Sequence, residues 1–161
     1  MIFAIAVVAA LLAPHEQFVD FFGKLMKQEN PFAAAPRLAD RMLSAKESRD
    51  DVWRRYDDDG CFVELGPFAG RTPQKILLVA PFSARDDALA YVRQISNAFT
   101  TAAQPRMPLE PDGPFEYRGT LMIERRPIGL EVDLAQVGSE WRVTVTLIAG
   151  GPRTLVPMTP P

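Results

Sequence analysis

The chain has 161 residues and a net charge of −2, from 18 Lys and Arg against 20 Asp and Glu. It is 47% hydrophobic and 24% charged, which is typical of one folded domain and excludes a disordered tail, while the near-neutral charge argues against a nucleic-acid partner. The single cysteine, Cys61, and the single histidine, His15, exclude an internal disulfide and a multi-cysteine zinc site, so we expect no cofactor.

Residues 1–13 form an uncharged apolar run that ends at Pro14. A helix that spans a bilayer needs about 20 residues, but this length fits the hydrophobic region of a secretory signal. Small residues at Val8 and Ala10 would permit cleavage after Ala10. We therefore predict a signal peptide and a periplasmic or secreted protein. The alternatives are a buried first strand and an uncleaved anchor that tethers the protein to a membrane.

We expect residues 14–149 to form a single domain that begins with two helices. In the first, from Pro14 to Gln28, five apolar residues follow a single helical stripe. They are Phe18, Phe21, Phe22, Leu25 and Met26. The second starts near Pro36, has apolar residues broadly along one side, and is predicted to continue until Tyr56 to Gly60, because glycine commonly follows the end of a helix.

The pattern then changes to short strands and one long helix. Cys61 to Leu65 alternates like a strand with the Cys61 thiol buried, and Gly66 to Pro73 is rich in turn residues. The continuous apolar run Ile76 to Ala80 predicts a strand that is buried on both faces. Ser83 is placed to cap a helix over residues 84–103.

The last third of the domain shows strict alternation of apolar and polar residues in three segments. These are Phe115 to Ile123, Ile128 to Leu134 and Glu140 to Leu147. Short turns at Arg126-Pro127 and Gly138-Ser139 would join them into an antiparallel meander. We expect the long helix to cover the apolar face and the polar face to be in contact with water.

These elements predict an α+β domain with two N-terminal helices, a mostly antiparallel sheet of about five strands and one long helix packed on that sheet. The element order resembles the cone-shaped folds of the nuclear-transport-factor-2-like superfamily, in which helices wrap a curved sheet around an apolar pocket. The resemblance lies in topology alone and assigns no functional residue.

One weak metal-site candidate consists of Asp57, Asp59 and Glu64 around Gly60. Oxygen ligands at alternate positions before a glycine are typical of a calcium loop. In the EF-hand spacing, however, the first ligand position would fall on Arg55 and the twelfth on Gly66. The simpler interpretation is a solvated helix end, so no metal is predicted.

The polar face of the meander carries a second set of charged residues. They are Glu116, Glu124, Glu131 and Asp133 together with Arg118 and Arg142. Facing carboxylates perform general acid and base catalysis when burial separates their pKa values. On an exposed sheet they form cross-strand ion pairs with arginine, which is the interpretation we favour.

Two proline-rich segments follow. Pro105, Pro108, Pro111 and Pro114 recur at every third residue, which matches the turn of a polyproline II helix. This segment is either a stiff connector or a ligand for an aromatic groove of a partner. Residues 150–161 are predicted to be a flexible tail.

The sequence therefore favours a small exported, non-catalytic binding domain whose partner is a protein or a small apolar ligand. The alternative is a small pocket enzyme of the hydrolase, isomerase or dehydratase type that works with carboxylates in the cone-shaped fold. A buried Glu or Asp with a raised pKa would favour the enzyme. A third possibility is a membrane-tethered subunit that retains residues 1–13 and docks through its proline-rich segment.

Overall fold

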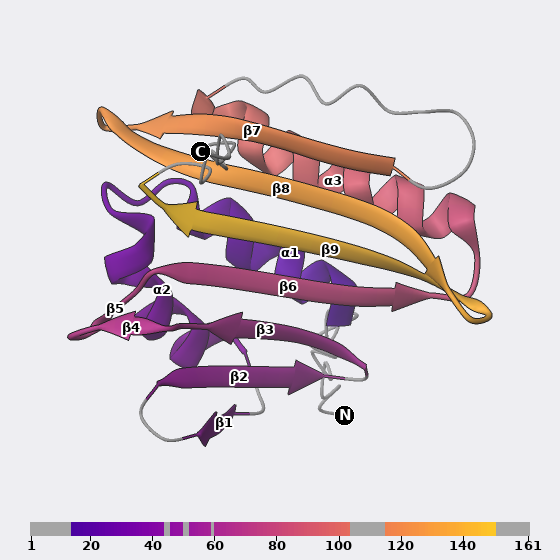
Figure 1. Ribbon diagram of the computed structural model, residues 1–161, viewed down its shortest axis with the longest axis horizontal. Helices are drawn as coiled ribbons and strands as arrows, with labels where there is room; N and C mark the ends of the chain where they lie inside the picture. Colours follow the sequence, from indigo (N-terminus) through magenta and orange to yellow (C-terminus); the bar gives the residue numbers. More distant parts are fainter. Residues whose placement is uncertain (1–13, 44–45, 50–51, 59, 104–114, 151–161) are drawn as a thin grey trace, which may run out of the picture.

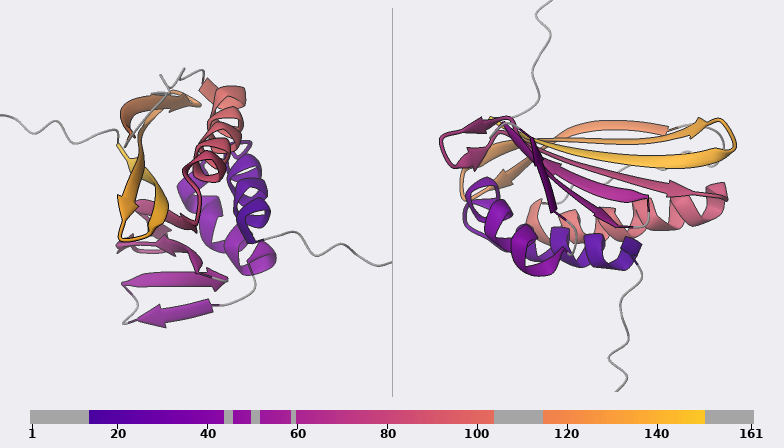
Figure 2. Two further views of the ribbon diagram at one scale, coloured as in Figure 1. Left: turned by 90° about the vertical axis from the view of Figure 1, so that its right-hand side faces the viewer. Right: turned by 90° about the horizontal axis from the view of Figure 1, so that it is seen from below.

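The computed structural model describes residues 14–43, 46–49, 52–58, 60–103 and 115–150. Three helices lie together on one face of an antiparallel sheet of seven strands (Figures 1 and 2). The predicted α+β class is confirmed. The predicted leader, the residues Pro105, Pro108, Pro111 and Pro114, and the tail beyond Gly150 lie outside the described residues.

The strand order in the sheet is β1-β2-β3-β6-β9-β8-β7, and each neighbouring pair is antiparallel. The strands are β1 (Lys46–Arg49), β2 (Trp53–Asp58), β3 (Cys61–Leu65), β6 (Lys75–Phe82), β7 (Phe115–Ile123), β8 (Arg126–Val137) and β9 (Glu140–Ala149). A separate hairpin of β4 (Phe68–Ala69) and β5 (Thr72–Pro73) occupies the turn-rich connection between β3 and β6.

The first two helices are α1 (Pro14–Leu25) and α2 (Pro31–Met42). Asn30 caps α2, because its side-chain oxygen accepts a hydrogen bond from the Ala33 amide at 3.3 Å. The prediction that this helix continues to Tyr56 is wrong, since residues 46–58 contain strands β1 and β2. A helical pattern and a strand pattern would each bury Tyr56. Val52, which belongs to the predicted helical stripe, is instead 50% exposed. The segment joins the sheet because β2 forms hydrogen bonds with β3.

This difference also changes the element order. Two additional strands lie where a long second helix was expected, so the sheet is larger than the predicted five strands. The resemblance to the nuclear-transport-factor-2-like superfamily depended on that predicted order and loses its basis here.

The central strand β6 is buried on one face only. Ile76, Leu78 and Ala80 are fully buried toward the helices, whereas Leu77 and Val79 are half-buried on the opposite face. The prediction of burial on both faces is wrong, because all three helices pack on the same side of the sheet (Figure 2). The outer side of this central strand is therefore apolar, and no helix of the described residues covers it.

The C-terminal meander has the predicted strands, and helix α3 (Arg85–Ala103) covers its apolar face. The turn between β7 and β8 differs in position. It is formed by Glu124 and Arg125, with φ of 47° and 63°, so the predicted turn residues Arg126 and Pro127 belong to β8. The second turn is as predicted, with Gly138 at a φ of 64°.

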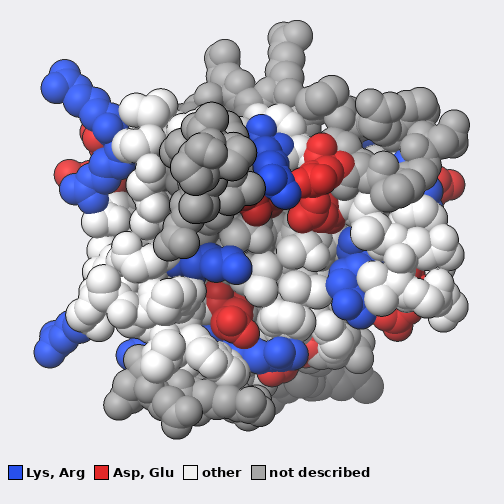
Figure 3. Space-filling view, viewed as in Figure 1, with Lys and Arg blue, Asp and Glu red and all other residues white. Residues whose placement is uncertain are grey.

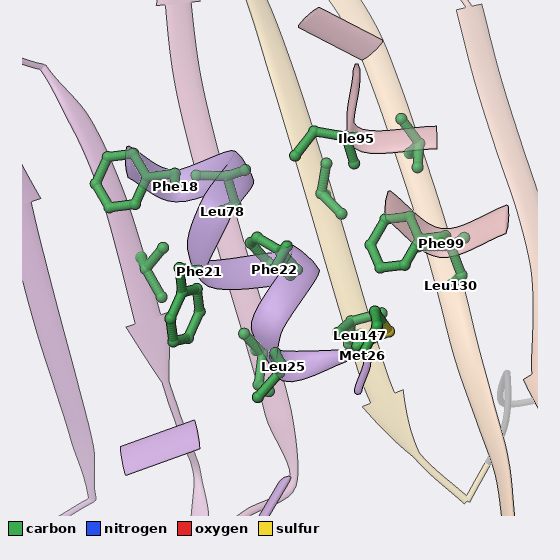
Figure 4. Packing of buried hydrophobic residues seen from close by; sticks show 14 of the residues in the cluster. Phe18, Phe21, Phe22, Leu25, Met26, Leu78, Ile95, Phe99, Leu130 and Leu147 are labelled. Carbon is green, nitrogen blue, oxygen red and sulfur yellow. The ribbon is translucent and has the colours of Figure 1, made fainter. Parts of the chain in front are cut away.

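The hydrophobic core fills the space between the helices and the sheet (Figure 4). The predicted stripe of α1 is entirely buried, with Phe21, Phe22 and Leu25 at 0% exposure. Phe22 meets Phe99 of α3 edge to face, with ring centroids 5.9 Å apart. This packing covers one face of the sheet, and no helix of the described residues covers the other face.

Candidate functional site: the outer face of the sheet

The outer face is the side of the seven-stranded sheet opposite the helices (Figures 2 and 3). The strand registers place alternate side chains of each strand on it. They include Arg55, Asp57, Phe62, Glu64, Lys75, Leu77, Val79, Glu116, Arg118, Glu131, Asp133, Arg142, Thr144, Thr146 and Ile148. Figure 3 shows side chains of both charge signs, some of them in contact with each other, among uncharged surface.

An apolar strip runs through the middle of the outer face. It consists of Phe62, Leu77, Val79 and Ile148, which come from β3, β6 and β9 and are each half-buried. Phe62 lies directly opposite Val79, so their side chains are cross-strand neighbours. No helix of the described residues covers the strip, and its remaining exposure is available to a partner.

A groove of about 350 Å³ lies beside the strip. It is lined by Pro67, Gln74, Lys75, Glu131, Thr146 and Ile148. Thr146 is 7% exposed, so a hydroxyl group is buried at the floor of the groove. Lys75 and Glu131 supply opposite charges from strands on either side of β9, so the groove suits a polar group next to an apolar one.

The acidic trio of the outer face consists of Glu116, Glu131 and Asp133. Glu116 lies directly opposite Asp133 across β7 and β8, which places two like charges side by side. Burial of the Asp133 carboxyl, together with the negative charges of Glu116 and Glu131, raises its pKa above the ordinary value, while Arg118 acts in the opposite direction. Asp133 therefore carries its charge in an unfavourable environment.

The expected ion pairs are found only in part. Arg118 contacts Glu116 at 2.5 Å along the same strand and lies opposite Glu131. This arginine therefore provides positive charge next to two members of the acidic trio. Arg142 lies opposite Pro81 and Ala135 instead of a carboxylate. Glu124 does not belong to the outer face, because it forms the turn after β7.

The weak metal-site candidate is placed on a hairpin and not at the predicted helix end. Asp57 lies on β2, where both of its carboxylate oxygens accept from the Arg55 Nε, at 2.9 and 3.0 Å. Glu64 lies opposite Arg55 on β3, and Asp59 is outside the described residues. Within the described ranges no group of three His, Cys, Asp or Glu side chains is arranged to hold a metal ion.

A partly buried cluster at one end of the sheet brings together the single histidine and the single cysteine of the chain. His15 stacks on Phe82 at 4.3 Å between ring centroids, and its Nε2 lies 3.1 Å from the Pro81 carbonyl. Tyr91 packs edge-on against His15, and burial and the nearby Cys61 raise the pKa of the tyrosine. Cys61 is 0% exposed, which confirms the predicted buried thiol.

The sequence does not indicate that these residues lie together, although it contains one signal. Tyr91 precedes Val92 in the apolar stripe of the predicted third helix, and that position faces the core. The contact of α1 with β6 joins residues far apart in the chain, and no pattern within the sequence indicates it.

Among the described helices, none is both long and apolar enough to cross a membrane. Comparison with protein-family models, with curated proteins and with solved structures found no match in any of the three.

Proposed function

We propose that this protein is an exported, non-catalytic binding domain that holds a protein partner on the outer face of its sheet. The observation that carries the proposal is the apolar strip, which lies on the uncovered side of a central strand and is bordered by charges of both signs. Export is supported by the sequence of residues 1–13.

The composition of the outer face favours a protein over a small apolar ligand. Protein interfaces combine an apolar centre with a polar rim, and charged residues around the centre fix orientation and partner choice. The strip supplies such a centre, and Lys75 and Glu131 in the adjoining groove supply opposite charges. A small apolar ligand instead prefers a concave and mainly apolar pocket.

One observation favours the alternative, a pocket enzyme that works with carboxylates. Asp133 has a raised pKa and lies opposite Glu116, an arrangement that resembles a pair of carboxylates used as acid and base. Both side chains, however, project from the outer face, where Arg118 contacts Glu116. In the described core the buried side chains include no carboxylate.

The binding proposal is tested by photo-crosslinking in cells of the native host. A photoreactive amino acid at position 77, in the apolar strip, should yield a discrete adduct with one protein. The same amino acid at position 90, an exposed alanine of α3, is the matched control and should not yield that adduct.

The substitution Val79→Lys, added to the chain that carries the probe at position 77, should abolish the adduct while the thermal midpoint stays close to that of the parent. Adducts that are the same at positions 77 and 90, or that survive Val79→Lys, would contradict the proposal.

A further inference from the structure

Strand β7 forms one edge of the seven-stranded sheet, and no described strand pairs with its outer side. It is nine residues long and keeps an unbroken register with β8 from Phe115 to Ile123. Edge strands of monomeric proteins are commonly blunted by proline, charged side chains, a bulge or short length. β7 is long, has no proline and keeps an unbroken register, and its two charged residues, Glu116 and Arg118, have opposite signs, so its free backbone groups are suited to accept a strand of complementary charge.

From this edge we infer that two copies of the protein pair antiparallel through Phe115 to Gly119 of β7, around a two-fold axis at Tyr117, so that their two sheets join into one. A two-fold axis perpendicular to the sheet keeps the helices of both copies on the same side. Residues that lie directly opposite each other across the new pair then have their side chains on the same face of the sheet. This condition requires that the axis pass through a position where a residue faces its own copy, and not midway between two residues.

The charges of β7 select the position of this axis. With the axis at Tyr117, Glu116 of each copy lies opposite Arg118 of the other, which gives two symmetric attractive pairs. With the axis at Glu116 or Arg118, identical charges would meet. With the axis at Gly119, Glu116 and Arg118 would lie opposite uncharged residues. Within the strand, the Tyr117 register therefore makes both charged pairs favourable.

The same register also improves the surroundings of the acidic trio. In the single copy, Glu116 lies opposite Asp133 on β8, and the two carboxylates repel each other. Arg118 of the same strand already contacts Glu116. The second copy would add its own Arg118 on the edge side of Glu116, across from Asp133. Pairing at the β7 edge would thus place a basic side chain where it reduces the repulsion between Glu116 and Asp133.

The test uses sedimentation of the full chain over a range of concentrations. The wild type should show a monomer–dimer equilibrium. Arg118→Glu leaves two acidic residues on the edge and Glu116→Arg leaves two basic residues, so each variant alone should dimerise at least about tenfold more weakly. An equimolar mixture of the two variants should recover the dimer, because every facing pair then has opposite signs.

The recovery on mixing separates an interface from a damaged fold, since a misfolded chain is not repaired by another variant. Arg142→Glu on β9 is the matched control, because it reverses a charge on the outer face away from the edge and should leave association unchanged. Apolar residues 1–13 would associate without regard to these charges.

A wild type that is monomeric at all concentrations would overturn the proposal and indicate that residues 104–114 or a different protein cover the edge. An association that ignores both charge reversals would overturn it as well. The binding function proposed for the outer face stands or falls independently, because its probe positions 77 and 90 do not lie on β7.

Discussion

The buried tyrosines Tyr56 and Tyr91 differ in the hydrogen bonding of their hydroxyl groups. The Tyr56 hydroxyl donates a hydrogen bond to Asp40 at 2.7 Å, whereas the Tyr91 hydroxyl has no hydrogen-bond partner among the described residues. A buried polar group without a partner costs about 1–3 kcal/mol, and a satisfied one stabilises the fold by about 1 kcal/mol. The same chemical change at the two positions should therefore have opposite effects.

We expect Tyr91→Phe to leave the free energy of unfolding unchanged or to raise it by about 1 kcal/mol, because the variant buries no unpaired hydroxyl. Tyr56→Phe should lower it by about 1–2 kcal/mol, because it leaves Asp40 without this donor. Urea unfolding measures both values. Equal losses at the two positions would show that the Tyr91 hydroxyl does have a partner, such as a buried water.

Asp133 gives a prediction about pH. Its folded-state pKa is raised, so the folded chain binds the proton more tightly than the unfolded chain. The contribution of this residue to stability is therefore favourable at low pH and is lost as pH rises from the ordinary aspartate pKa through the raised one. Asp133→Asn should remove this dependence and raise the free energy of unfolding at pH 7 by about 0.5 kcal/mol.

The matched control is Asp57→Asn on the same face of the sheet. Asp57 accepts from Arg55 and lies opposite Phe62, so its neutralisation relieves no repulsion and should lower the free energy of unfolding slightly. Urea unfolding from pH 3 to 8 separates the two variants. If Asp133→Asn lost stability at pH 7, the Asp133 carboxylate would have a stabilising partner on the outer face.

At the scale of elements, the corner after β3 depends on a close backbone approach. Gly66 has a φ of +143°, and a Cβ atom there would lie 2.6 Å from the Val52 carbonyl oxygen. Gly70, in the next turn, also has a positive φ of +64° but has open space around it. Both positions require a conformation that other residues adopt poorly, and only the first adds a collision with backbone.

Gly66→Ala should therefore lower the free energy of unfolding by about 3 kcal/mol or more, and Gly70→Ala by about 1 kcal/mol. Chemical denaturation of the two variants gives the comparison. Similar losses would mean that the loop around residue 52 moves away without cost and that the approach is not required.

The elements that sequence alone predicts well are those with one clear period. The first helix and the three strands of the meander each bury a single face. The spacing of their apolar residues therefore matches the repeat of a helix or of a strand. Residues 46–58 carry mostly charged side chains, and their few apolar positions fit a helix as well as a strand. Strand β2 is fixed by its pairing with β3 and β1 by its pairing with β2, and the apolar pattern of the segment does not indicate these contacts.

The outer face was predicted for the meander but not for the whole sheet. Alternation in the C-terminal strands indicated a polar face with Glu131 and Asp133. The apolar strip was missed because Leu77 and Val79 form a continuous run with buried neighbours, and periodicity does not reveal which face of such a strand the helices leave uncovered.

At the scale of the whole molecule, the leader gives the first prediction. The chain produced in a bacterial host should reach the periplasmic fraction with a mass reduced by residues 1–10. Ala10→Phe places a large residue before the cleavage site and should yield the full-length mass. A full-length wild type that remains with membranes after a high-salt wash would favour the tethered subunit instead.

The order of the strands also has a consequence for how the chain reaches its structure. β1 to β3 form one set of local hairpins and β7 to β9 another. Among the described strands, β6 connects the two sets, because it pairs with β3 on one side and, from Lys75 with Ile148 to Phe82 with Trp141, with β9 on the other. Strands β6 and β9 are far apart in the sequence, so a long loop must be closed before they can pair. The formation of the β6–β9 ladder should therefore limit the folding rate. Substitutions that weaken the β6–β9 ladder should slow refolding, whereas those in β1 and β2 should chiefly speed unfolding.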